Sequence, residues 1–268
     1  MNEKQKPTRE LTIGEIITQT FSLYSQKFAQ YLIPFLIAGI ITGIITMAIY
    51  YAIKIPAPPL SPPQNPTPEE IANWLSQFSS YLGAVLASAF LAGIVGWVIS
   101  QITQGIGVKF TADTLEKGKA DLRTSFNFTI SKLLSLLAVS IITGILIILG
   151  AIVFIIPGII LAIIFSLVVP TIIIENTGTL ESLSRSRSLV SHRWLKTLAL
   201  LLLLYLIIFI ANILIGAITL PFGDAAPLAN GILAAFIQPI LPIGLTLYYY
   251  SMIARATPQE PPQPIQTT

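Results

Sequence analysis

The chain has 268 residues, of which 54% are hydrophobic and 10% are charged, and its formal net charge is +3. A soluble domain has about 25% charged residues, so this supply of charge is too small to cover a water-exposed surface. Cysteine is absent, which excludes disulfide frameworks, thiolate metal sites, iron–sulfur clusters and cysteine nucleophiles.

Several apolar stretches are long enough to cross about 30 Å of hydrocarbon. Helix is the expected form, because open sheet edges are unsatisfied in lipid and the runs lack the alternation of a barrel. The sequence therefore predicts an all-α, polytopic membrane helical bundle with about six transmembrane helices, at 29–53, 81–108, 133–156, 158–174, 198–220 and 228–253. This membrane domain covers 11–256, between a polar N-terminal segment at 1–10 and a C-terminal tail at 257–268 that is expected to be disordered.

Interfacial amphipathic helices are expected at about 12–28 and 179–194. The first begins at Thr12 and Glu15, which have the spacing of a capping box, and its apolar residues recur on one face. Thr67 and Glu70 form a second capping box, so the segment after them either lies along the interface or extends the second span outward. The third and fourth spans are expected to form a hairpin with its turn at Ile156-Pro157-Gly158.

Three segments share a pattern in which a basic residue stands just before a span. When these segments are aligned on Lys27, Lys132 and Arg193, a hydroxyl residue lies seven positions earlier in each, at Thr20, Ser125 and Ser186. The pattern favours three repeats of one interfacial helix and one two-span hairpin. A basic residue at the start of each span is also what any membrane protein shows, so the alternative of no repeat stays open.

The basic residues predict the orientation in the membrane, because they concentrate on the cytoplasmic side. With six spans, Lys54 alone falls on one side of the membrane, and the other 14 of the 15 basic residues fall on the opposite side. These 14 are Lys4, Lys6, Arg9, Lys27, Lys109, Lys117, Lys119, Arg123, Lys132, Arg185, Arg187, Arg193, Lys196 and Arg255. We therefore expect a multi-pass protein of the cytoplasmic membrane with both termini in the cytoplasm.

A catalytic or ion-coupling site in a membrane usually requires an ionisable group inside the hydrocarbon. The predicted spans contain none at mid-depth, and His192 is the only histidine. Hydrolase, nucleotide-binding and metalloprotease motifs are absent. We expect no catalytic residue, no metal site, no cofactor and no nucleic-acid partner.

Small residues recur at helix-packing spacing in the first two spans, which favours close packing of these spans with each other or with a neighbouring chain. They are Gly39, Gly43, Gly83, Ala87, Gly93 and Gly96. Prolines at Pro34, Pro170, Pro239 and Pro242 can kink or interrupt helices. Pro239 and Pro242 lie deepest in their span, and together with the polar residues Asn212 and Gln238 they mark a candidate cavity.

The segment from Pro170 to Trp194 contains an apolar stretch ending in Glu175, then Gly178, then Arg185-Ser186, Leu189-Val190 and Arg193-Trp194. With the opening Leu11–Ile17, this pattern resembles the membrane-domain family named after glycerophosphoryl diester phosphodiesterases and related six-span families of unknown function. The resemblance implies a six-span membrane domain. We expect this chain to lack the soluble catalytic domain of those enzymes, so no catalytic residue is carried over.

The charged residues at the predicted cytoplasmic boundary are candidates for lipid-headgroup binding or for structural ion pairs. They are Lys27, Lys132, Glu175, Arg185, Arg187, Arg193 and Lys196. Glu175 is expected to pair with Arg185 or Arg187.

These features favour a non-enzymatic, lipid-interacting or accessory scaffold component of the membrane. Its expected partners are anionic headgroups on the cytoplasmic side, with a second copy or another membrane protein as candidate neighbours. Two alternatives stay open: a transporter of small solutes or lipids, and a headgroup enzyme that uses Glu175, His192 and nearby arginines.

Overall fold

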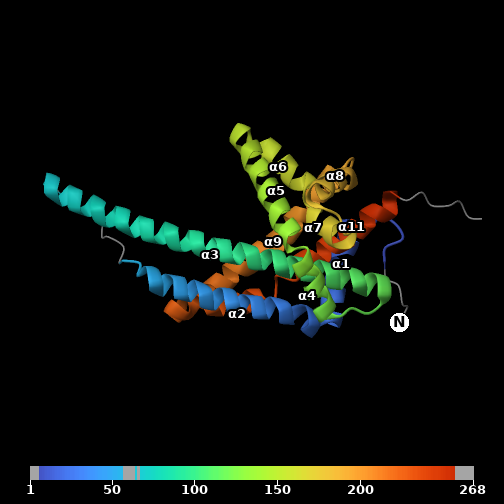
Figure 1. Cartoon of the computed structure of the whole chain (residues 1–268), viewed down its shortest axis with the longest axis horizontal. Coiled ribbons are helices and arrows are strands. Elements are labelled where there is room, and N and C mark those ends of the chain that lie inside the picture. The colour runs from blue at the N-terminus through green and yellow to red at the C-terminus, as the bar shows by residue number, and fades with distance from the viewer. Residues whose placement is uncertain (1–5, 57–63, 65–66, 257–268) are drawn as a thin grey trace, which may run out of the picture. The chain divides into compact units, whose positions relative to one another are not determined.

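The computed structural model of the chain describes residues 6–56, 64 and 67–256, and within them every regular element is a helix. In chain order (Figure 1) these are α1 (Ile13–Gln26), α2 (Phe28–Ile53), α3 (Pro68–Lys117), α4 (Leu122–Ser131), α5 (Leu133–Val153), α6 (Ile155–Ile164), α7 (Val168–Ile174), α8 (Thr179–Val190), α9 (Trp194–Thr219), the 3-10 helix η1 (Leu220–Ala225), α10 (Ala226–Ala234) and α11 (Ile240–Ala256). The predicted all-α helical bundle is confirmed. The tail at 257–268, expected to be disordered, lies outside the described residues.

Five helical segments of the described chain are long and apolar enough to cross a membrane: Phe28–Ile53, Pro68–Lys117, Leu133–Val153, Ile155–Ile174 and Trp194–Ala234. Large apolar side chains on them are exposed, among them Leu134 at 81% and Ile152 at 74%. A surface of this kind is stable against lipid rather than against water. The fold is therefore that of a helical membrane protein.

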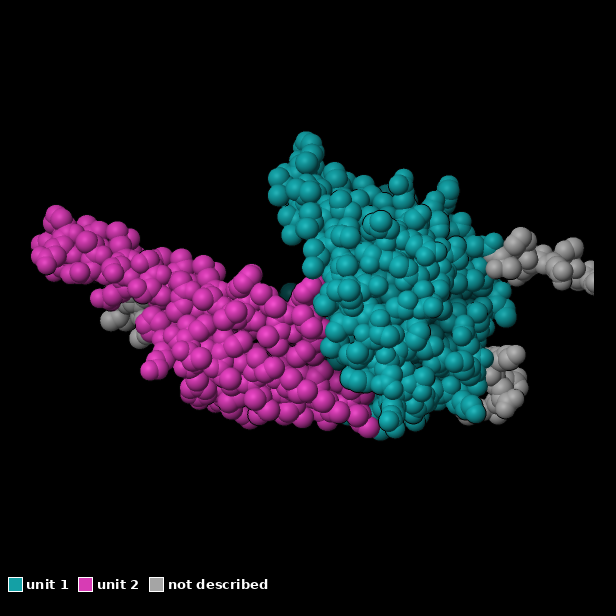
Figure 2. Space-filling model, in the orientation of Figure 1, with its two compact units in different colours: residues 1–32, 101–209, 238–268 teal, residues 33–100, 210–237 magenta. Residues whose placement is uncertain are grey.

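The chain forms two compact units, coloured separately in Figure 2. Unit 1 comprises 1–32, 101–209 and 238–268, and unit 2 comprises 33–100 and 210–237. Unit 1 holds the short helices α1, α4 and α8 and nearly all of the charged groups discussed below. Each unit is described by itself.

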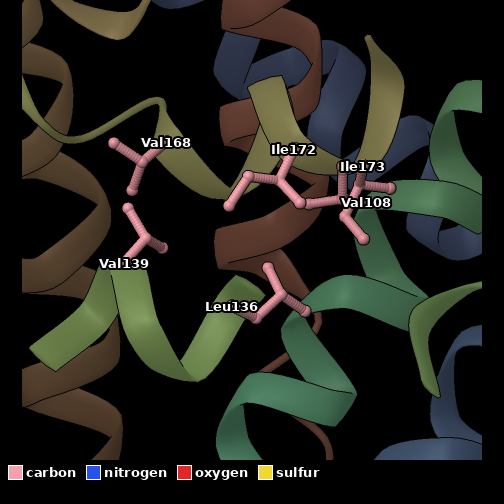
Figure 3. Packing of buried hydrophobic residues seen from close by; sticks show 6 residues of the cluster. All are labelled: Val108, Leu136, Val139, Val168, Ile172 and Ile173. Atoms are coloured by element: carbon pink, nitrogen blue, oxygen red, sulfur yellow. The ribbon is translucent and has the colours of Figure 1, made fainter. Parts of the chain in front are cut away.

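The core of unit 1 joins helices that are distant in sequence. Figure 3 shows a cluster in which α3 contributes Val108, α5 contributes Leu136 and Val139, and α7 contributes Val168, Ile172 and Ile173. Helix α11 is buried from Ile240 to Met252 and contacts α1, α7 and α8. It is therefore the central helix of this unit.

The fourth predicted span is interrupted, because residues 165–167 form a turn between α6 and α7. Pro170 is the third residue of α7, where the missing N–H of proline would not have been needed. Ser186 of α8 pairs with backbone groups on both sides of the break. Its hydroxyl donates to the Ile164 carbonyl at 2.7 Å and accepts from the Leu167 N–H at 3.2 Å. Unpaired backbone groups at this depth would otherwise be costly.

The sixth predicted span, 228–253, is also interrupted, because residues 235–239 form a turn between α10 and α11. Pro242 is the third residue of α11, as Pro170 is of α7. Pro34, in contrast, lies inside the continuous helix α2. The interruption near the deeper pair Pro239 and Pro242 agrees with the expectation for these prolines, whereas the break before α7 was not expected, because Pro170 was placed near the end of its span.

Both predicted capping boxes are confirmed. The Thr12 hydroxyl accepts from the Glu15 N–H at 3.3 Å and Glu15 accepts from the Thr12 N–H at 2.7 Å, and Thr67 and Glu70 bond in the same way. Helix α3 then runs unbroken for 50 residues, so the segment after Thr67 extends the second span.

The turn between the third and fourth spans lies at Phe154, not at Pro157-Gly158 as expected. Phe154 has extended backbone angles, and α6 begins at Ile155. Gly158 lies within α6, where it allows close packing: a Cβ built on Gly158 would lie 2.8 Å from the Ala151 side chain of α5. The glycine therefore serves helix packing instead of the turn.

Within unit 2, the predicted small residues have different surroundings on α2 and on α3. Gly39 and Gly43 of α2 lie against α10 in unit 2, where a Cβ on Gly39 would be 2.1 Å from the Gly231 carbonyl oxygen and one on Gly43 would be 2.6 Å from the Leu228 Cα. A Cβ on Gly83 or Gly93 of α3 would meet nothing within 4 Å, Ala87 is exposed, and Gly96 only approaches the Thr42 methyl at 3.9 Å. The close partner of α2 is therefore α10 rather than α3.

The element order matches the three expected repeats, each a short helix followed by a two-span hairpin. The short helices are α1, α4 and α8, and Lys27, Lys132 and Arg193 stand at the junctions that follow them. The hydroxyl residues seven positions earlier, Thr20, Ser125 and Ser186, are each fully buried. The residues four positions after each junction, Tyr31, Leu136 and Thr197, are also buried in all three repeats.

Candidate functional site

Three consecutive tyrosines on α11 organise the polar groups of unit 1. Tyr248, Tyr249 and Tyr250 are all buried. Successive helical residues point about 100° apart, so the three rings face different neighbours. Tyr248 bonds to Thr197 of α9 at 2.6 Å, while Tyr249 and Tyr250 donate to carboxylates at the ends of two further helices.

Glu175, at the end of α7, accepts from two helices at once. Its Oε1 accepts from Arg185 Nε at 2.7 Å and from the Tyr249 hydroxyl at 2.5 Å. The expected ion pair between Glu175 and α8 is therefore present, and Arg185 rather than Arg187 makes it. The pair fixes α8 and α11 to α7.

Glu116, near the end of α3, has an equivalent arrangement. It accepts from the Tyr250 hydroxyl at 2.8 Å and pairs with Lys6 at 3.4 Å. Lys6 also lies over the Tyr250 ring, 4.7 Å from its centroid. Lys6 is thereby held against α3 and α11.

Glu10 holds the largest group of cations. It pairs with Lys196 at 2.5 Å, with Arg193 at 3.1 Å and with Arg255 at 3.8 Å. Lys196 also donates to the Leu11 carbonyl at 2.6 Å. Partial burial opposes the charged form of Glu10, but the hydrogen bonds from Lys196 and Arg193 outweigh it, and the pKa of this carboxyl lies below its usual value.

The other two junction cations, Lys132 and Lys27, contact a backbone carbonyl and an aromatic ring instead of a carboxylate. Lys132 donates to the Asn176 carbonyl at 3.3 Å. The Lys27 ammonium lies 5.8 Å from the centre of the Phe110 ring, close enough for a cation–π contact. Of the seven charged candidates, only Arg187 has a side chain with no hydrogen bond, ion pair or ring contact to the described residues.

Arg187 lines a groove of about 300 Å³ in unit 1, together with Ile160, Ile164, Val190, Ser191, His192 and Trp194. The groove lies between α6 and the segment that joins α8 to α9. His192 has a left-handed backbone, with φ of 63°, and its Nδ1 bonds to the Ser191 hydroxyl at 2.8 Å. Most of the groove surface is therefore apolar, and Arg187, Ser191 and His192 are the polar residues among its lining.

The candidate cavity residues lie in different settings. Asn212 is exposed on α9 in unit 2, Gln238 is exposed in the turn before α11, and Pro239 and Pro242 are buried. The groove is lined by other residues. Among the described residues, no group of three or more His, Asp or Glu side chains is placed to hold a metal ion.

The tyrosine run and the Glu10 cluster were not predicted. The signal for the tyrosines was present, because three hydroxyls inside an apolar helix each need a partner. Their partners are 51, 74 and 134 residues away, a separation at which local spacing carries no information. Glu10 belonged to a segment expected to be merely polar.

These features define an integral membrane protein of the all-helical class. Unit 1 contains a polar layer, formed by the three tyrosines of α11 and the paired carboxylates Glu10, Glu116 and Glu175. The chain belongs to the family described as a domain of unknown function (DUF7847), whose model matches residues 26–250. No curated protein and no solved structure matches the chain. The expected membership of an uncharacterised membrane family is supported, whereas the match shows no link to the glycerophosphoryl diester phosphodiesterase membrane family.

Proposed function

We propose that the protein is a non-enzymatic membrane component that binds anionic lipid at the cytoplasmic side of the bilayer. The observation that carries the proposal is the distribution of charge in unit 1. The carboxylates Glu10, Glu116 and Glu175 are already paired within the protein, so they do not repel anions approaching the surface.

Cations remain in excess around this layer. Arg187 and Lys119 are exposed, and no ion pair joins either of them to the described residues. Each basic residue near an anionic membrane surface contributes about 1 kcal/mol. The positive-inside distribution of the sequence supports the same side of the membrane for both.

The paired groups support a scaffold rather than a reaction site. Catalytic carboxylates are usually poised by burial or by like charge, whereas Glu175 is fixed by Arg185 and Tyr249 at once. His192 bonds to Ser191 and not to Glu175. The headgroup-enzyme alternative required these groups to converge, so the geometry gives it little support.

The proposal is tested by native mass spectrometry of the full-length protein, released from nanodiscs of equal parts phosphatidylglycerol and phosphatidylcholine. We expect the protein to retain phosphatidylglycerol in clear preference to phosphatidylcholine. Equal retention of the two lipids would refute anionic-lipid binding.

A transporter is the second candidate, and the broken helices favour it. Interrupted spans occur at binding sites in many secondary transporters, and here the turns at 165–167 and 235–239 interrupt two spans. Cysteine accessibility is a direct assay in a chain without native cysteine. Labelling of Gln238→Cys by a membrane-impermeant maleimide from both sides of a vesicle would support transport, and labelling from one side or neither would count against it.

A further inference from the structure

The groove between α6 and the α8–α9 junction is mostly apolar, with a few polar residues among its lining. Its apolar side is formed by Ile160 and Ile164 of α6 and by Val190 of α8. Ile160 is 41% exposed, so this side is open to whatever surrounds α6. Because α6 is part of an apolar segment of membrane-crossing length, its surroundings are acyl chains.

The other side of the groove carries Arg187, Ser191, His192 and Trp194. A guanidinium presents several N–H donors in a planar fork that matches two oxygens of a phosphate. Arg185, two residues earlier, is occupied by Glu175, while Arg187 has no carboxylate partner among the described residues. Arg187 therefore gives the groove a positive charge that is paired with no described carboxylate.

Two backbone features fix the positions of Arg187 and His192 in the groove. Ser186 is bonded to both ends of the α6–α7 break, which holds the neighbouring Arg187 at the level of Ile164. His192 adopts a left-handed conformation that is rare for a residue with a side chain, and it lies between the end of α8 at Val190 and the start of α9 at Trp194. Tryptophan is enriched at the headgroup level of membranes, which agrees with a boundary between hydrocarbon and headgroups at this point.

We propose that the groove binds one anionic glycerophospholipid of the surrounding leaflet, an inference that rests on the lipid-binding function proposed above. The phosphate lies against Arg187 and the Ser191 hydroxyl, and the first part of one acyl chain lies along Ile160 and Ile164. A volume of about 300 Å³ is at the lower end for small-molecule sites, so the groove takes this part of the lipid and leaves the remainder in the bilayer.

The site is tested in full-length protein by native mass spectrometry with titrated phosphatidylglycerol. Arg187→Gln removes the phosphate contact, and Arg123→Gln is the matched control, since Arg123 is another exposed arginine of a short helix. We expect Arg187→Gln to weaken the tightest phosphatidylglycerol binding event about tenfold, equivalent to about 1.4 kcal/mol, and Arg123→Gln to leave it unchanged.

A second variant, Ile160→Trp, fills the groove without changing its charge. We expect it to weaken the same binding event, which keeps the test valid if Arg187→Gln does not fold. Inorganic phosphate is the probe for a soluble anion: if it displaces phosphatidylglycerol at millimolar concentration, the site recognises phosphate alone and the proposed lipid site is wrong.

The outcomes separate the two proposals. If the wild type prefers phosphatidylglycerol but Arg187→Gln and Arg123→Gln weaken binding equally, the general lipid-binding function survives and the groove site is refuted. If the wild type shows no preference, both are refuted.

Discussion

The contact between α2 and α10 predicts opposite effects for two glycine-to-alanine substitutions in unit 2. In Gly39→Ala the new Cβ would lie 2.1 Å from the Gly231 carbonyl oxygen, whereas real Cβ atoms essentially never come closer than 3.0 Å. The two backbones must therefore separate by about 1 Å, the difference between these distances. Neither partner can yield by a rotamer change, because both contacting groups are glycine backbone.

Overpacking of this kind costs about 1–3 kcal/mol. Gly83→Ala is the matched control, since a Cβ there meets nothing within 4 Å and α3 is helical throughout. Replacing a mid-helix glycine by alanine stabilises by about 0.5–1 kcal/mol. We expect Gly39→Ala to lower the free energy of unfolding and Gly83→Ala to leave it unchanged or raise it.

The assay is unfolding of the purified protein by SDS in mixed micelles, followed by circular dichroism. The sign of the difference between the two variants decides the result. If Gly39→Ala is as stable as Gly83→Ala, the close approach of α2 and α10 does not exist in the membrane protein, and the packing described for unit 2 is wrong.

Three further predictions concern unit 1 and use the same unfolding assay. Tyr249→Phe removes a hydrogen bond to a carboxylate and should cost about 1.5–3 kcal/mol, whereas Tyr205→Phe on the exposed face of α9 should change little; equal effects would contradict the polar layer. Ser186→Ala leaves two backbone groups unpaired and should lower the free energy of unfolding by about 1–3 kcal/mol. Ser188→Ala, at an exposed position two residues later on α8, is the near-neutral control. Glu10→Gln should destabilise at pH 7 and progressively less below about pH 4.5, because the pKa of Glu10 is lowered on folding and its stabilising effect is lost as the carboxylate of the folded protein is protonated; a pH-independent difference would be inconsistent with an ion-pair role.

The sequence predicted the helices well, because their signals are local. Hydrophobic length located the membrane segments, and the capping boxes at Thr12 and Thr67 located two helix starts. Proline spacing predicted the interruption before α11. The turn at Phe154 was misplaced because Pro157 and Gly158 are typical turn residues, and their use for packing inside α6 depends on the neighbouring helix α5.

The candidate site was predicted only in part, because its geometry depends on contacts between distant segments. The alignment of the three repeats did find Thr20, Ser125 and Ser186, and all three are buried. A choice between Arg185 and Arg187 as the partner of Glu175 requires the rotation of α8 about its axis, which its pattern of alternating serine and arginine does not specify. The hydrogen bonds of Ser186 set that rotation.

The three tyrosines of α11 restrict which motions the protein can make. Because their hydroxyls bond to groups in three directions around the helix, a rotation of α11 about its own axis, or a slide by one residue, would break all three bonds in the same step. Any conformational cycle that unit 1 performs must therefore leave this helix stationary and place the movement in the elements around it.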